Sequence, residues 1–173
     1  EVVSNLADYA GVYSEWSPNE KVALEVAMGA SFGGARSLAA MKHVGVNVAA
    51  DPLFTFAYTG VNGGCVVVSA DDPGMHSSQN EQDNRGYGIF AKLPVVEPSD
   101  SQEAKDFTRL AFDISERFDC PVMLRVTTRL CHSQSLVELG DVPERPLMEY
   151  KKNSQKYVML PVNARPRHVA VEK

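Results

Sequence analysis

The sequence predicts an α/β domain of three layers, in which a doubly wound and mostly parallel sheet is covered by helices on both faces. Short apolar runs typical of strands alternate with longer helical patterns along the chain. One run, residues 65–70 (CVVVSA), is apolar at nearly every position, as in a strand buried on both faces of a parallel sheet. With 44% hydrophobic and 23% charged residues among 173, the chain has the composition of a folded globular domain.

The first predicted elements lead into a long helix. Residues 1–10 carry apolar side chains at helical spacing and end at a glycine, and residues 12–16 resemble a strand. A helix then starts at Ser17-Pro18. Serine is a good cap, proline suits the first helical position, and Glu20 completes a capping box.

That helix continues through KVALEVAMGASFGGAR, although each glycine weakens a helix by about 1 kcal/mol relative to alanine. Gly29 and Gly33 lie four residues apart and therefore share one face. A face without side chains lets another backbone or a ligand approach closely. We therefore take both glycines as candidate cofactor contacts.

The other elements follow from the same patterns. They are strands at residues 37–41, 65–70, 93–96 and 121–126, a turn at Asp51-Pro52 followed by a helix to Tyr58, and an amphipathic helix at residues 100–118. Residues 71–87 are polar and aperiodic, so we expect a long loop that is functional or disordered. We assign residues 1–138 to the α/β domain. Residues 139–173 are expected to form an extended carboxy-terminal arm, or a linker to a further domain, available to a partner chain.

Ligands of such folds bind outside the carboxyl ends of the strands. The turn at residues 16–20 and the loop at residues 71–87 each follow a predicted strand, so both are expected along one rim. The Glu20 carboxylate has two readings there, a partner of the helix cap or a ligand-binding group, and local sequence leaves both open. Glu15, on a strand, and Glu25, on a solvated helix face, are its rivals.

Further candidates follow the strand at residues 37–41. Lys42 and His43 stand at the same rim, where a Lys-His pair usually faces solvent. His43 and His76 are the imidazoles there that titrate near neutral pH. A weaker alternative is a metal site, although the spacing of its residues matches no calcium loop. Its ligands would be Asp71, Asp72, His76 and Asp83.

Composition excludes several classes of function. The 17 basic and 22 acidic residues give a net charge of −5, which argues against nucleic-acid binding. No apolar run approaches the roughly 20 residues of a membrane helix. The cysteines Cys65, Cys120 and Cys131 are odd in number and form no CxxC, which predicts no disulfide framework and no zinc or iron–sulfur cassette in this chain. We expect thiols in a reducing cytoplasm, without a signal peptide.

Six stretches of the sequence carry a resemblance to one family. They are NEKVALEVAMGASFGGAR, MKHVGVNVAADPLFTFAYTGVNGG, VVVSADDPGMHSSQNEQDNR, FAKLPVVEPSDSQEAKD, ERFDCPVMLRVTTRLCHSQSLVE and KYVMLPVNARPRH. Together they resemble the amino-terminal part of the alpha subunit of indolepyruvate ferredoxin oxidoreductases. These belong to the thiamine diphosphate-dependent 2-oxoacid:ferredoxin oxidoreductases. The resemblance covers nearly the whole chain and implies a domain that binds the pyrimidine ring of the cofactor.

The resemblance implies a catalytic role for Glu20. It matches the glutamate that hydrogen-bonds the ring nitrogen of the cofactor's aminopyrimidine and favours the imino form of the exocyclic amine, which then removes the thiazolium proton. It also implies a substrate-binding region around Lys42, His43, His76 and Ser77. Relatives keep a carboxylate-binding arginine in the matching loop, but here no arginine occurs before Arg85, so that role stays unassigned.

The resemblance further implies an oligomeric enzyme that converts aryl pyruvates such as indolepyruvate to acyl-coenzyme A and passes electrons to ferredoxin. The expected partners are the rest of the alpha subunit, a beta subunit, ferredoxin, coenzyme A and the aryl pyruvate. Magnesium and the diphosphate are expected on a missing domain, and iron–sulfur clusters elsewhere in the full enzyme.

We expect this chain to be a fragment that is inactive alone, because the family's TPSS motif and later domains are missing from it. The alternative function is a noncatalytic module that only associates with other subunits, which an extended arm and a polar loop would suit.

Overall fold

The computed structural model describes residues 2–141 and 145–173. Residues 1 and 142–144, parts of the predicted first helix and of the predicted arm, lie outside the described residues. The helices are α1 (Val2–Leu6), α2 (Glu20–Phe32), α3 (His43–Val48), α4 (Ala50–Thr59), α5 (Arg85–Ala91), α6 (Ser101–Phe118), α7 (Thr128–Cys131), α8 (Ser154–Tyr157) and α9 (Pro161–Val171). The strands are β1 (Ser37–Lys42), β2 (Cys65–Asp71), β3 (Val95–Val96) and β4 (Val122–Thr127).

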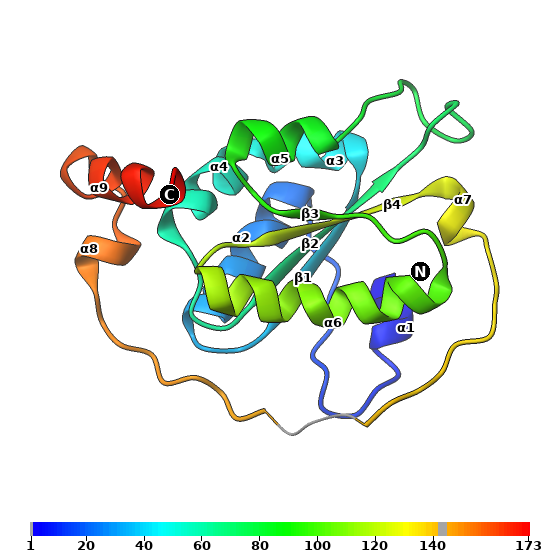
Figure 1. Ribbon diagram of the computed structural model, residues 1–173, viewed down its shortest axis with the longest axis horizontal. Coiled ribbons are helices and arrows are strands. Elements are labelled where there is room, and N and C mark those ends of the chain that lie inside the picture. The colour runs from blue at the N-terminus through cyan, green and yellow to red at the C-terminus, as the bar shows by residue number, and fades with distance from the viewer. Residues whose placement is uncertain (1, 142–144) are drawn as a thin grey trace.

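The four strands form one parallel sheet in the order β1-β2-β4-β3, with helices on both faces (Figure 1). The predicted fold class is therefore confirmed. Strand β2 lies inside the sheet and has only one residue that is not buried, as its continuous apolar run predicts.

Two apolar cores lie on opposite faces of the sheet. On one face Cys65, Val67 and Met123 pack with residues of α2, α3 and α4. On the other face Val66 and Val68 pack with residues of β4 and with α6. The alternation along β2 therefore assigns neighbouring residues to different cores.

Helix α2 begins later than predicted. Its cap is Asn19, whose side chain accepts a hydrogen bond from the backbone N–H of Val22 at 3.0 Å. Asparagine caps helices as well as serine does, so Ser17 and Pro18 remain outside the helix and the predicted capping box is wrong. Glu20 is instead the first helical residue, where the helix dipole favours a negative charge.

The predicted strand at residues 12–16 is also wrong, because these residues have no strand structure. They are held locally, since the Ser14 hydroxyl donates to the backbone oxygen of Val3 at 2.7 Å. Tyr13 and Trp16 are exposed. A strand also requires a neighbouring backbone with which to pair, and the local sequence does not show whether one is present.

Two further differences concern helices. The helix predicted from about Pro52 to Tyr58 is confirmed as α4, but the Asp51-Pro52 pair lies in its first turn, where proline is tolerated, and not in a turn before it. The region predicted as a loop at residues 71–87 ends in α5, which starts at Arg85. The strands at 37–41, 93–96 and 121–126 and the amphipathic helix at 100–118 are confirmed within a few residues.

The segment predicted as an extended arm is partly helical. Residues 145–153 are extended, and α8 and α9 follow them. Helix α9 packs against α4 of the same chain (Figure 1). Arg167 of α9 donates to the backbone oxygen of Tyr58 at 2.7 Å and to Asp119 at 2.8 Å. These residues therefore lie on the sheet domain, while the boundary between domains stays a prediction.

None of the helices in the described part of the chain is long and apolar enough to cross a membrane. Cys65 is buried, and burial raises the pKa of its thiol to about 12. Burial likewise raises the pKa of the half-buried Cys120 thiol to about 11. Both thiols therefore have little nucleophilic character at neutral pH.

Candidate functional site

The candidate site lies at the carboxyl edge of the sheet. Strands β1, β2 and β4 are parallel, so Lys42, Asp71 and Thr127, their last residues, lie at the same edge. The loop from residue 72 to residue 84 leaves β2 at this edge (Figure 1). Ligands of parallel α/β sheets bind at this position.

Helix α2 brings Glu20 to this edge. The Glu20 side chain lies against Gly45 of α3, which directly follows β1. At the other end of α2, the Ser31 hydroxyl donates to the backbone oxygen of Gly63, which precedes β2. The helix therefore runs opposite to the strands. Glu20 lies at the predicted edge for this reason, and not because a strand precedes it.

The Glu20 carboxylate is half-buried and has unused hydrogen-bonding capacity. No residue in the described ranges donates a hydrogen bond to it or forms an ion pair with it. Its two rivals differ, because Glu25 is exposed and Glu15 accepts a hydrogen bond from the Tyr13 hydroxyl at 2.7 Å. Glu20 is thus the acidic group at this edge that can accept a hydrogen bond from a ligand.

Lys42 and Ser77 are brought together by the fold. The Lys42 ammonium donates to the backbone oxygen of Ser77 at 3.0 Å, and both residues are exposed. A backbone oxygen is a weak partner for a full charge. The ammonium can therefore turn to an anionic ligand at small cost.

His43 lies elsewhere than expected, because it is fully buried as the first residue of α3. Its Nε2 lies 3.1 Å from the backbone oxygen of Asn80. Its Nδ1 is buried and has no hydrogen-bond partner among the described residues. The expectation of a solvent-facing pair is wrong for His43, since the loop at residues 72–84 folds over it.

His76 and Ser77 are held in the loop by their backbones. Their N–H groups donate to the Asp72 carboxylate at 3.1 and 2.7 Å. The Thr128 hydroxyl donates to the same carboxylate at 2.8 Å. The Ser77 N–H and the Thr128 hydroxyl hold the pKa of Asp72 well below its usual range. The side chain of His76 is exposed.

Sequence reasoning missed a buried ion pair at this edge. Arg125 Nε donates to Asp71 at 2.7 Å, and their side chains are 6% and 0% exposed. Asp71 also accepts hydrogen bonds from the Ser69 hydroxyl and the Asn84 N–H. The signal was available, because an arginine inside the apolar strand VMLRVT and an aspartate at the end of VVVSAD both require partners.

The alternative metal site has no support in the structure, because its carboxylates have other partners. Asp71 is paired with Arg125, Asp72 with the loop, and Asp83 with Arg85 at 2.6 Å. Within the described ranges, no three His, Cys, Asp or Glu side chains are grouped as metal ligands.

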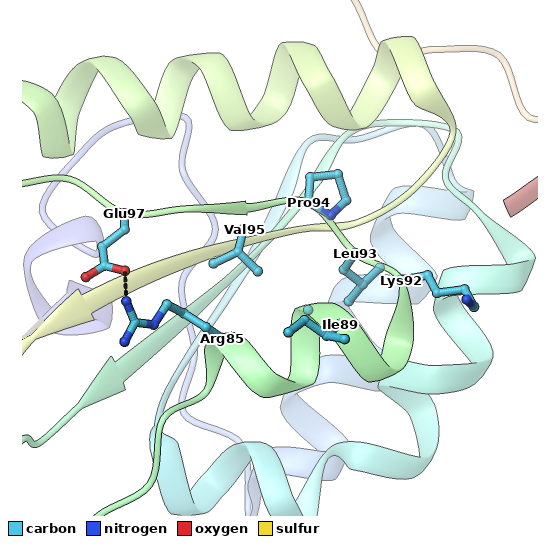
Figure 2. A pocket seen from close by; sticks show the side chains of 8 residues that line it. Arg85, Ile89, Lys92, Leu93, Pro94, Val95 and Glu97 are labelled. Carbon is cyan, nitrogen blue, oxygen red and sulfur yellow. Dashed lines mark ion pairs between the residues drawn. The ribbon is translucent and has the colours of Figure 1, made fainter. Parts of the chain in front are cut away.

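A hollow of about 570 Å³ lies between α5 and β3 (Figure 2). The residues lining it include Ile89, Leu93 and Val95, with Arg85 and Glu97 at one end. Arg85 and Glu97 face each other across 3.9 Å. Glu20, Lys42 and His43 do not line this hollow.

The comparisons with known proteins identify the family of this chain. Residues 17–172 match the family described as the thiamine diphosphate-binding domain of pyruvate flavodoxin/ferredoxin oxidoreductase. The chain belongs to this family.

Its relatives include several archaeal proteins named indolepyruvate oxidoreductase subunit IorA. The protein of Archaeoglobus fulgidus is 61% identical over 88% of this chain and 25% of its own length. The protein of Pyrococcus abyssi is 51% identical over 97% of this chain and 27% of its own length. The chain therefore spans about a quarter of the length of these relatives.

Membership of this family tests the site against thiamine diphosphate. A carboxylate that accepts a hydrogen bond from a protonated ring nitrogen must lie at the ligand-binding edge and have a free oxygen. Glu20 has both properties, since its helix brings it to this edge against α3, and it has no partner among the described residues. The residues present therefore fit the pyrimidine end of the cofactor.

Of the other predicted cofactor contacts, Gly29 lies further along α2 and Gly33 directly follows its last residue. Gly29 is nine residues after Glu20, which is about 14 Å along the helix axis. Both glycines are exposed, and a Cβ added to Gly29 would meet no atom within 4 Å. Their face of α2 is thus open, and contact of either glycine with the cofactor stays a prediction.

Proposed function

We propose that this chain supplies Glu20 as the carboxylate that activates thiamine diphosphate in an oxidoreductase acting on aryl pyruvates such as indolepyruvate. The observation that carries the proposal is a carboxylate that lies against α3 and has no partner among the described residues, at the edge of the sheet where this fold binds ligands. The names of the archaeal relatives support the choice of substrate.

Glu20 acts by holding a proton at a defined atom. Its carboxylate accepts a hydrogen bond from the protonated ring nitrogen of the aminopyrimidine and stabilises that proton. When bound, thiamine diphosphate supplies the electron sink that makes decarboxylation of a 2-oxoacid possible. The start of α2 fixes the backbone of Glu20, and the neighbouring α3 covers one side of its side chain.

The residues proposed for substrate binding have different roles. Lys42 and Ser77 lie at the exposed surface of the edge, where the ammonium is available to a substrate carboxylate. His43 is buried beneath the loop, so we assign it to holding the loop through Asn80. His76, in the same loop, is exposed and is able to contact the aryl part of the substrate.

The remaining parts of the reaction need the rest of the enzyme. We propose that magnesium and the diphosphate are held by another domain of the full-length subunit, and that iron–sulfur clusters elsewhere pass electrons to ferredoxin. A beta subunit and coenzyme A complete the oligomeric, cytoplasmic enzyme. The alternative of a noncatalytic association module has less support, because α9, within the supposed free arm, packs on α4.

The test uses Glu20→Gln in the full-length subunit assembled with its partners. Glutamine keeps the size of the side chain but accepts the ring proton poorly, so turnover should fall at least about 100-fold, or about 2.7 kcal/mol in activation free energy. Glu25→Gln, on the exposed face of the same helix, is the matched control and should leave turnover unchanged.

Calorimetric titration with thiamine diphosphate and magnesium should still show binding to the Glu20→Gln enzyme. Near-normal turnover of this variant would reject the proposed role. No cofactor binding by the wild-type subunit would favour the association module.

A further inference from the structure

Gly45 of α3 is buried directly against Glu20. A Cβ atom added at Gly45 would lie 2.6 Å from Cγ, 2.9 Å from Oε1 and 3.0 Å from Cδ of Glu20. The first two distances are shorter than real Cβ contacts, so an atom must move, and the third is a tight contact. The carboxyl group of Glu20 therefore occupies the space where any other residue at position 45 would place its side chain.

The backbone does not explain why a glycine stands at this position. Gly45 lies inside α3, and it is not among the glycines with positive φ, which are Gly11, Gly34, Gly60 and Gly74. Alanine is the better helix former at such a position. The neighbour that requires glycine here is thus the Glu20 side chain.

The start of helix α3 is held by hydrogen bonds at His43. The backbone oxygen of His43 accepts hydrogen bonds from Gln82 at 2.8 Å and from Asn84 at 3.2 Å. The His43 ring also lies 3.1 Å from the Asn80 oxygen. Because these contacts fix the start of α3, an added methyl group at position 45 would displace the flexible Glu20 side chain and leave the helix in place.

We propose that Gly45 is a positioning residue, whose missing side chain lets the Glu20 carboxyl group lie against α3 at the carboxyl edge of the sheet. The inference rests on the proposed function of Glu20. It adds that a second helix, α3, sets the position of the Glu20 carboxylate. Gly45 does this without a side chain of its own and without touching substrate or cofactor. Misplacing a catalytic group by about 1 Å costs up to about 100-fold in rate.

The experiment compares Gly45→Ala with Gly86→Ala in the full-length subunit assembled with its partners. A Cβ at Gly86, in α5, would meet no atom within 4 Å, so this control adds the same methyl group to a helix without a neighbour. A crystal structure of the cofactor-free Gly45→Ala subunit should show the Glu20 carboxyl group turned away from α3, with the backbones of α2 and α3 unchanged.

A second readout is the hydrogen–deuterium exchange of the thiazolium C2 proton of bound thiamine diphosphate, followed by NMR after acid quench. Gly45→Ala should slow this exchange by at least about tenfold, while cofactor affinity measured by calorimetry changes less. Gly86→Ala should match the wild type in both.

The outcomes separate the two proposals. If Glu20→Gln slows the exchange and Gly45→Ala does not, the positioning role of Gly45 is wrong and the role of Glu20 stands. If Glu20→Gln leaves the exchange unchanged, the proposed function fails. In a Glu20→Ala background the Gly45→Ala change should have no further effect, because the displaced atoms are already gone. A further loss there would show that Gly45 acts through another group and would overturn the inference.

Discussion

The two edges of the sheet use their charged groups differently. At the amino edge, before β1, Arg36 donates to Asp113 and Glu116 at 2.7 Å, and Arg145 reaches the same two carboxylates. Before β4, Asp119 accepts from Lys156 and Arg167, each at 2.8 Å. The charges named at this edge all have partners of opposite sign.

The carboxyl edge has groups without such partners. The Glu20 carboxylate and the Nδ1 of His43 lack hydrogen bonds among the described residues, and Lys42 is paired only with a backbone oxygen. Of these three groups, only the His43 Nδ1 is both buried and without a partner, and a buried polar group of this kind costs folding free energy. The amino edge thus stabilises the domain, and the unpaired groups of the carboxyl edge are those for which we propose a binding role.

The carboxyl edge also has paired charges, and we expect the buried Asp71–Arg125 pair to stabilise this edge most. Arg125→Met should lower the free energy of unfolding by about 3–5 kcal/mol, because it leaves the Asp71 charge buried without a counterion. Chemical denaturation measures this loss. Arg85→Met, whose side chain is 58% exposed, is the control and should cost less than about 1 kcal/mol. If both variants lost the same unfolding free energy, the burial of Arg125 would not account for its contribution.

A smaller effect is expected at Asp72, and it depends on pH. The pKa of this carboxylate is lower in the folded chain than its ordinary value of about 3.9, so its contribution to stability is present above that value and is lost as pH falls below it. Asp72→Asn should therefore destabilise the protein at neutral pH. The difference from wild type should shrink as the pH falls below about 4.

Denaturation at a series of pH values, with amide exchange at Ser77, measures this effect. The exposed Asp8 gives the control variant Asp8→Asn, which should show no such dependence. A difference between wild type and Asp72→Asn that is constant with pH would contradict the loop-anchoring role of this carboxylate.

The smallest effect is expected at the amino edge. Arg167→Met removes the contacts of α9 with Tyr58 and Asp119 and should cost about 1 kcal/mol, mainly by local opening of α9. Amide exchange should become faster in α9 and stay unchanged in the sheet. Arg165→Met, on the exposed side of the same helix, should leave exchange as in the wild type. Faster exchange in β2 would show that the two edges are not independent.

Much of the fold could be predicted because strand and helix periods differ. The run at residues 65–70 and the amphipathic pattern at residues 100–118 appear in the structure as β2 and α6. The predicted strand at residues 12–16 failed because pairing depends on a neighbour that no local pattern reveals. The start of α2 was displaced because Ser17 and Asn19 are both good caps, and only the path of the chain selects one.

The sequence by itself determined which residues can form strands and helices, and it identified Glu20, through the family's motifs, as the residue to examine. Only the tertiary structure decided that Glu20 faces Gly45, that His43 is buried, and that Asp71 pairs with Arg125. The physical reason is the separation of the contacting residues along the chain. Periodicity and capping act within a few residues. By contrast, Glu20 and Gly45 are 25 positions apart, His43 and Asn80 are 37 apart, and Asp71 and Arg125 are 54 apart.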